Sequence, residues 1–184
     1  MPLPDSEVER ELRHTRRVRY EGYKRADGLW DIEAHLTDVK NHDYQLKTGV
    51  RRAGQPVHGM WVRVTVDRRM TIVDAVASTD AVPYPGGCET ITPAYRKLIG
   101  LNLMKGFRKN VHELLGGVRG CTHITELLGG LPTAAIQTLA GEVREDRDDG
   151  TKPFQLDQCH ALETSSETVR KWYPKWHRKE KTSA

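Results

Sequence analysis

The chain has 184 residues, a length that suits a single domain with one hydrophobic core. Hydrophobic residues make up 37% and charged residues 29%, and no apolar run is long enough to span a bilayer, so no membrane partner is expected. The net charge is +4, but residues 170–184 hold six Lys and Arg against one Glu, so the rest of the chain sums to −1. The basicity therefore belongs to the C-terminal tail and does not indicate a basic nucleic-acid-binding domain.

The N-terminus and the cysteines indicate the compartment. The first residues lack the basic and apolar regions of a secretory signal, so we expect a cytoplasmic protein. There are three cysteines, an odd number, and the cytoplasm is reducing, so a disulfide framework is not expected. The thiols are therefore core residues, metal ligands or nucleophiles.

The first half of the chain alternates between polar and apolar residues, which is typical of β-strands. After a loose polar lead-in over residues 1–12, the alternation starts near Val18 and turns at Asp27-Gly28, a dipeptide that accepts the positive φ of a hairpin turn. Residues 30–36 return with their apolar side chains on one face. Residues 39–56, interrupted by glycines, predict a loop and an edge strand.

A second hairpin follows this loop. Residues 60–66 again place their apolar side chains on one face, residues 67–69 turn the chain, and residues 72–77 run back. Four antiparallel strands in a meander are the simplest assembly.

Helices are predicted after a Pro- and Gly-rich break over residues 81–88. Thr92-Pro93 is typical of a helix start, and Gly100 of its end. A second helix is expected over residues 107–115.

A third helix starts near Cys121 or Thr122 and continues to Leu139, and Pro132 should kink or split it. Residues 142–150 are charged and predict a surface linker. Residues 154–162 and 168–172 are expected to form a last hairpin.

Strands followed by helices, without alternation of the two, indicate the α+β class. We expect one domain over residues 1–184, an antiparallel β-meander packed by about three helices, with a C-terminal β-hairpin. A basic tail over residues 174–184 ends the chain.

Several motifs together resemble one known family. They are residues 27–38 (DGLWDIEAHLTD), 58–67 (HGMWVRVTVD), 106–107 (GF), 115–128 (LGGVRGCTHITELL) and 157–162 (DQCHAL). The Gly-Cys-Thr-His segment is the most specific of them. From about residue 12 to residue 177 the chain resembles the bacterial family known only as domain-of-unknown-function family 2889. The resemblance implies a small single-domain bacterial protein and implies no activity.

The thiols and imidazoles are the first candidate site. Cys88, Cys121 and Cys159 each lie at an element boundary, and three thiolates with one imidazole, such as His123, suit zinc or iron. His160 or His58 could replace His123. The spacing lacks a CxxC motif, so only folding could bring these ligands together, and buried unlinked cysteines are an equally good interpretation.

Cys121 is also a candidate nucleophile. A cysteine at a helix N-terminus is activated by the helix dipole, and His123 is a possible base. Residues two apart do not face each other on a helix, so this pair works only if Cys121 precedes the helix. Otherwise the segment is an ordinary helix start capped by Thr122.

The polar face of the 30–36 strand is a third candidate. Asp31, Glu33 and His35 point the same way, and His58 is expected to lie on a neighbouring strand. Carboxylates and imidazoles perform general acid–base catalysis or bind a harder metal. The alternative is a solvated sheet face, which most antiparallel sheets have.

The aromatic and basic tail supports at most weak, nonspecific contact with nucleic acid. The leading hypothesis is a cytoplasmic metal-binding protein, with zinc or iron, that acts on a small molecule. A non-catalytic accessory domain with structural thiols and a thiol enzyme using Cys121 are the alternatives. The sequence predicts no oligomeric state.

Overall fold

The computed structural model describes residues 3–142 and 150–178. By its internal contacts the chain divides into two compact units, Met1–Ala140 and Gly141–Ala184. The division falls beside the charged segment that predicted a linker, most of which (143–149) lies outside the described residues, as do residues 179–184 of the basic tail.

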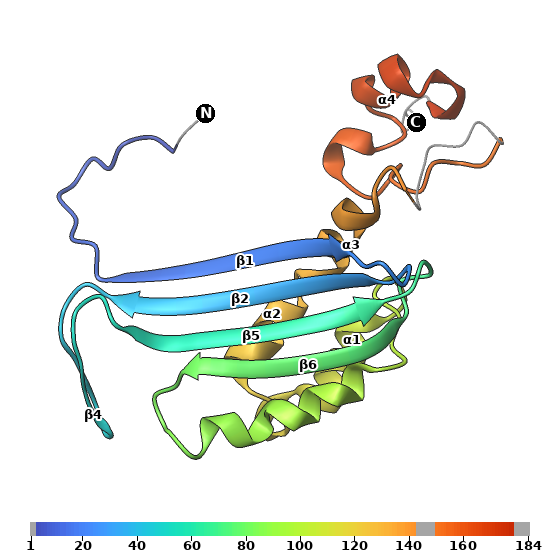
Figure 1. Cartoon of the computed structure of the whole chain (residues 1–184). Helices are drawn as coiled ribbons and strands as arrows, with labels where there is room; N and C mark the ends of the chain where they lie inside the picture. Colours follow the sequence, from blue (N-terminus) through green and yellow to red (C-terminus); the bar gives the residue numbers. More distant parts are fainter. Residues whose placement is uncertain (1–2, 143–149, 179–184) are drawn as a thin grey trace. The chain divides into compact units, whose positions relative to one another are not determined.

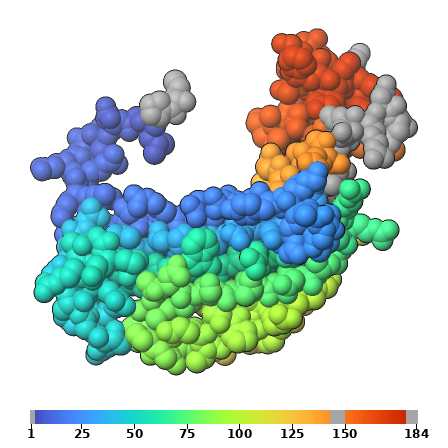
Figure 2. All heavy atoms as spheres, viewed as in Figure 1, coloured from blue at the N-terminus to red at the C-terminus, as the bar shows by residue number. Residues whose placement is uncertain are grey.

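The first unit is built on a four-stranded antiparallel sheet in the order β1-β2-β5-β6 (Figure 1). Its strands are β1 (His14–Lys24), β2 (Trp30–Lys40), β5 (Pro56–Val66) and β6 (Ile72–Ala81). A short arm of two strands, β3 (Tyr44–Leu46) and β4 (Gly49–Arg51), interrupts the meander between β2 and β5. Space-filling atoms show the side chains of β1 at the surface, as its place at the edge of the sheet requires (Figure 2).

The alternation in β2 and β5 predicts their buried faces correctly. Ile32 and Val64 are fully buried and Trp30 and Val62 almost so, and the two strands pair in antiparallel register. The predicted α+β class with its β-meander is therefore confirmed.

Helices cover one face of this sheet, the far face in Figure 1. They are the 3-10 helix η1 (Cys88–Leu98), α1 (Phe107–Leu115), the 3-10 turn η2 (Gly117–Arg119), α2 (Thr122–Leu128) and α3 (Leu131–Leu139). η1 packs on β6, α2 on β2 and β5, and α3 on β1 and β2. None of the helices within the described ranges is long and apolar enough to cross a membrane.

Two glycines let the helical layer approach β1. A Cβ at Gly22 would collide with the side chain of Thr138 on α3, and one at Gly130 would collide with the ring of Tyr20 on β1. The expected third helix is split at this point, because α2 ends at Leu128 and α3 begins at Leu131 with Pro132 in its first turn, where proline is tolerated.

The predicted C-terminal hairpin is wrong. The described part of the second unit contains η3 (His160–Leu162), α4 (Glu167–Trp172) and η4 (Pro174–Trp176), and residues 150–178 contain no strand. Ser166 accepts a hydrogen bond from the backbone N–H of Val169 at 3.2 Å and so caps α4. A capped first turn with Glu167 paired to Arg170 is a helix signal that outweighs the short apolar alternation.

Candidate functional site

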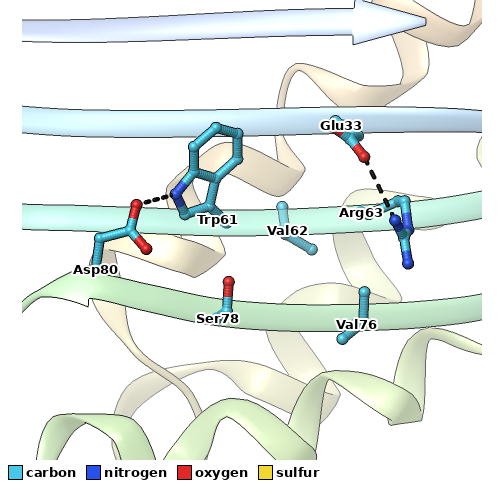
Figure 3. A pocket seen from close by; sticks show the side chains of 7 residues that line it. All are labelled: Glu33, Trp61, Val62, Arg63, Val76, Ser78 and Asp80. Carbon is cyan, nitrogen blue, oxygen red and sulfur yellow. Dashed lines mark hydrogen bonds and ion pairs between the residues drawn. The ribbon is translucent and has the colours of Figure 1, made fainter. Parts of the chain in front are cut away.

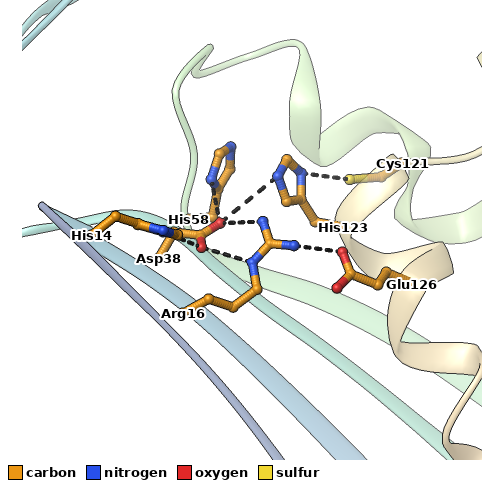
Figure 4. A network of polar contacts seen from close by, with 7 residues as sticks. All are labelled: His14, Arg16, Asp38, His58, Cys121, His123 and Glu126. Atoms are coloured by element: carbon orange, nitrogen blue, oxygen red, sulfur yellow. Dashed lines mark hydrogen bonds and ion pairs between the residues drawn. The ribbon is translucent and has the colours of Figure 1, made fainter. Parts of the chain in front are cut away.

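The candidate site starts from a carboxylate on the apolar face of β2. Asp38 follows Leu36 on the helix-covered side of the strand and is only 4% exposed. The strand register places Arg16 of β1 and His58 of β5 directly opposite it, so three strands contribute to one row. α2, in the helical layer beside this row, adds His123 and Glu126 (Figure 4).

Both oxygens of Asp38 accept two hydrogen bonds each. Arg16 donates from Nε to Oδ1 and from Nη2 to Oδ2, both at 2.8 Å. His14 Nε2 lies 2.7 Å from Oδ1, and His58 Nδ1 lies 3.0 Å from Oδ2. Burial alone would raise the pKa of Asp38, but the hydrogen bonds from Arg16 and His14 and the nearby positive charge hold it far below its usual value. Asp38 is therefore a permanent anion.

Arg16 also joins the sheet to the helical layer. Its Nη1 donates to Glu126 Oε2 on α2 at 2.6 Å, so one guanidinium bridges two carboxylates. The hydrogen bond to Asp38 raises the pKa of Arg16 above its ordinary value.

The two inner imidazoles are stacked. The ring centroids of His58 and His123 are 3.7 Å apart, with 28° between the ring planes. Burial lowers the pKa of both rings, and the neighbouring His123 lowers that of His58 further. Because ionised Asp38 only accepts, His58 Nδ1 is the donor to it, and His58 Nε2 keeps a free lone pair. Both rings are thus neutral bases at neutral pH.

His123 lies between a thiol and a carboxylate. Its Nδ1 is 4.0 Å from Cys121 Sγ, and its Nε2 is 3.8 Å from Asp38 Oδ2 (Figure 4). Cys121 is the residue before α2 and has extended backbone angles, φ −90° and ψ 130°. The condition for this pair is met, because Cys121 precedes the helix and its side chain is free to face that of His123.

The remaining thiols lie on other elements. Cys88 begins η1, and Cys159 is exposed in the second unit together with His160. Among the described residues, the group of three side chains with ligand atoms within 4.8 Å of one another is Asp38, His58 and His123. The four-ligand set with Cys88, Cys121, His123 and Cys159 spans both units and stays a prediction.

The polar strand face lies on the other side of the sheet. His35 stacks on Trp61 with centroids 3.7 Å apart, Glu33 pairs with Arg63 at 3.5 Å, and Asp31 accepts from Thr65 at 2.6 Å. Glu33, Arg63 and Trp61 line a shallow hollow of about 410 Å³ together with residues of β6 (Figure 3). The expected grouping of His58 with this face is wrong, because the register of β5 turns His58 toward Asp38. The sheet face instead carries ordinary cross-strand pairs.

Sequence reasoning missed Asp38, Arg16, His14 and Glu126. Asp38 did carry a signal, since it continues the apolar series of β2 in period two and so places a carboxylate on the buried face. Nothing in the sequence marks Glu126, which depends on how α2 packs.

The comparisons with known proteins give one match. A family model described as "Protein of unknown function (DUF2889)" matches residues 14–137. This range includes all seven residues of the cluster in Figure 4 and stops before the 157–162 segment, so it is shorter than the resemblance predicted. No curated protein and no solved structure matches the chain.

Proposed function

The chain belongs to the DUF2889 family, whose description assigns no activity, and we propose from the geometry alone that it is a thiol-dependent enzyme with Cys121 as nucleophile. The position of His123 carries this proposal, because its two nitrogens face the Cys121 thiol and the Asp38 carboxylate. A thiol, an imidazole and a carboxylate arranged in this spatial order are the parts of an activated cysteine nucleophile.

In the proposed reaction, neutral His123 takes the thiol proton at Nδ1 while the sulfur attacks an electrophilic carbon of a small molecule. Asp38 stabilises the imidazolium that forms, and Arg16 keeps Asp38 ionised throughout. The leaving group of the substrate departs with the proton from His123, so that the acyl group is joined to the Cys121 sulfur. His123 then takes a proton from a water molecule that attacks the same carbon, the carbon–sulfur bond breaks, and the proton returns to the Cys121 sulfur as the carboxylic acid is released. A thioester or another activated carbonyl compound is the substrate class that this chemistry requires. A reducing compartment keeps such a thiol free, so a cytoplasmic location belongs to the same proposal.

Competitive alkylation tests this proposal with the cysteines as internal references. We expect limiting iodoacetamide at neutral pH to modify Cys121 faster than exposed Cys159, as quantified by peptide mass spectrometry. His123→Ala should slow Cys121 by about tenfold, less than the 10²–10⁴ that a base contributes to full catalysis, because alkylation needs only the thiolate.

His35→Ala is the matched control, since it removes an imidazole from the opposite face of the sheet. It should leave the rate at Cys121 unchanged. Equal rates at Cys121 and Cys159 in the unmodified protein would refute a thiol enzyme.

Metal binding is the second candidate, because Asp38, His58 and His123 form a two-histidine, one-carboxylate group. Neutral imidazoles are the form that zinc or iron binds. Two features oppose it: Arg16, His14 and His58 already use both oxygens of Asp38, and stacked rings do not direct their lone pairs to one point.

Elemental analysis after dialysis against Zn²⁺ or Fe²⁺ separates the two candidates. A metal site predicts about one ion per chain, lost in His58→Ala and kept in Cys121→Ser. A thiol site without a metal predicts no bound ion. It also predicts that a chelator does not change the alkylation rate of Cys121. Loss of a bound ion in Cys121→Ser would instead favour the cysteine-based metal set.

A further inference from the structure

Tyr95 is a fully buried residue of η1 whose hydroxyl contacts the backbone of Cys121. The backbone N–H of Cys121 donates to Tyr95 Oη at 2.9 Å, and Tyr95 Oη lies 3.0 Å from the carbonyl oxygen of Cys121. The Thr125 hydroxyl is 2.8 Å away. One side chain therefore binds both polar backbone groups of the residue that carries the thiol.

The Tyr95 hydroxyl makes all three hydrogen bonds that a tyrosine hydroxyl can form. A tyrosine hydroxyl has one proton, so it donates to the Cys121 carbonyl while it accepts from the Cys121 N–H and from Thr125 Oγ1. The backbone N–H of Thr125 donates to the same carbonyl at 2.9 Å. These contacts fix Cys121 in the extended conformation immediately before α2.

This conformation decides where the sulfur points. Within a helix, side chains two residues apart diverge, so Cys121 would turn away from His123 if α2 began one residue earlier. An extended Cys121 faces His123 instead, and among the described residues, Tyr95 is the side chain that hydrogen-bonds to its backbone.

We propose that Tyr95 is a positioning residue for the Cys121 thiol, acting through the Cys121 backbone without touching substrate. The inference rests on the proposed thiol function and adds the group that sets the direction of its nucleophile. It gives the buried Tyr95 side chain a role beyond its packing in the core.

Tyr95→Phe tests the inference, because it keeps the buried ring and removes the hydroxyl. We expect the alkylation rate of Cys121, divided by that of Cys159 in the same molecules, to fall by at least about three- to tenfold, the change that losing even one of the three hydrogen bonds of the hydroxyl predicts. General loosening of the fold would expose Cys121 and raise this ratio, so a purely structural role does not produce the expected fall.

Tyr20→Phe is the matched control. Tyr20 donates its hydroxyl proton to the carbonyl oxygen of Leu127 at 2.9 Å, so this variant removes a tyrosine hydrogen bond from the other end of the same helix. The ratio should remain at its original value. An unchanged ratio in Tyr95→Phe, or an equal fall in both variants, would overturn the inference.

Amide hydrogen exchange of the unmodified protein covers the case in which Tyr95→Phe does not fold. The Cys121 amide should be protected, and exchange at the rate of a free helix N-terminus would also overturn the inference. Failure of the thiol function itself is separate, since it appears as equal reactivity of Cys121 and Cys159 before any substitution.

Discussion

Asp38 holds the cluster together because four hydrogen bonds from three side chains end on one buried carboxylate. A buried ion is tolerated only when its partners replace the water it lost. Replacing Asp38 therefore affects Arg16 and two imidazoles at once.

Asp38→Asn should lower the free energy of unfolding and slow alkylation of Cys121. Breaking a buried ion pair costs about 3–5 kcal/mol, but Arg16 is 33% exposed and keeps Glu126, so we expect about 1–3 kcal/mol. Urea denaturation measures the change. Asp27→Asn, in an exposed pair with Arg25, is the control and should have no measurable effect; the same behaviour in Asp38→Asn would show that the network is not structural.

At the residue scale, the sequence predicted three of the seven residues of the cluster, Cys121, His123 and His58. Cys121 and His123 are two positions apart, so the chain itself keeps them close. The extended backbone of Cys121 before α2 lets the two side chains face each other. Arg16 contacts both Asp38 of β2 and Glu126 of α2, and these contacts depend on strand register and helix packing, which no local pattern specifies.

At the element scale, the contact between α3 and β1 depends on Gly22, because glycine has no side chain. Strand β1 lies at the edge of the sheet, and α3 packs against it closely enough that a Cβ would overlap Thr138. The close packing of α3 on β1 thus requires glycine at position 22.

Gly22→Ala should destabilise the protein by about 1–3 kcal/mol, the usual cost of overpacking, although alanine generally favours a strand over glycine. Thermal unfolding measures it. Thr138→Ala removes two of the overlapping atoms, so the double variant should lose less than the sum of the single variants. Additive losses would mean that α3 moves away from β1 without strain.

Strands were more predictable than the terminal elements. The alternation in β2 and β5 extends over whole strands and reports burial directly, whereas residues 168–172 are too few to distinguish a strand from the capped helix α4. The first helix was placed correctly but is a 3-10 helix that begins at Cys88, before the expected Thr92.

At the scale of the whole molecule, the half-buried neutral histidines make stability depend on pH. His58 and His123 have pKa values lowered from the ordinary 6.5, so below about pH 7 the unfolded chain binds more protons than the folded one. Stability therefore falls as the pH is lowered through this window. Asp38 acts in the same direction at more acid pH, because its carboxylate stays ionised in the folded protein below its ordinary 3.8.

The urea midpoint should therefore decrease from pH 7 to pH 5 and decrease again below pH 4. His123→Gln should flatten the first decrease and leave the second. A midpoint that is constant from pH 7 to pH 5 would show that both imidazoles accept protons equally well in the folded and unfolded chain.

Arg16 connects the start of the domain to its end, since its partner Glu126 is 110 positions away in sequence. During synthesis β1 and β2 leave the ribosome long before α2. Asp38 can therefore pair with Arg16 early, whereas Cys121 and His123 are synthesised much later. Contacts of such long range close late in folding. Under the proposed thiol function, a nascent or half-folded chain consequently carries a Cys121 thiol without its Asp38–His123 partners in place, and the thiol becomes reactive only when the domain is complete.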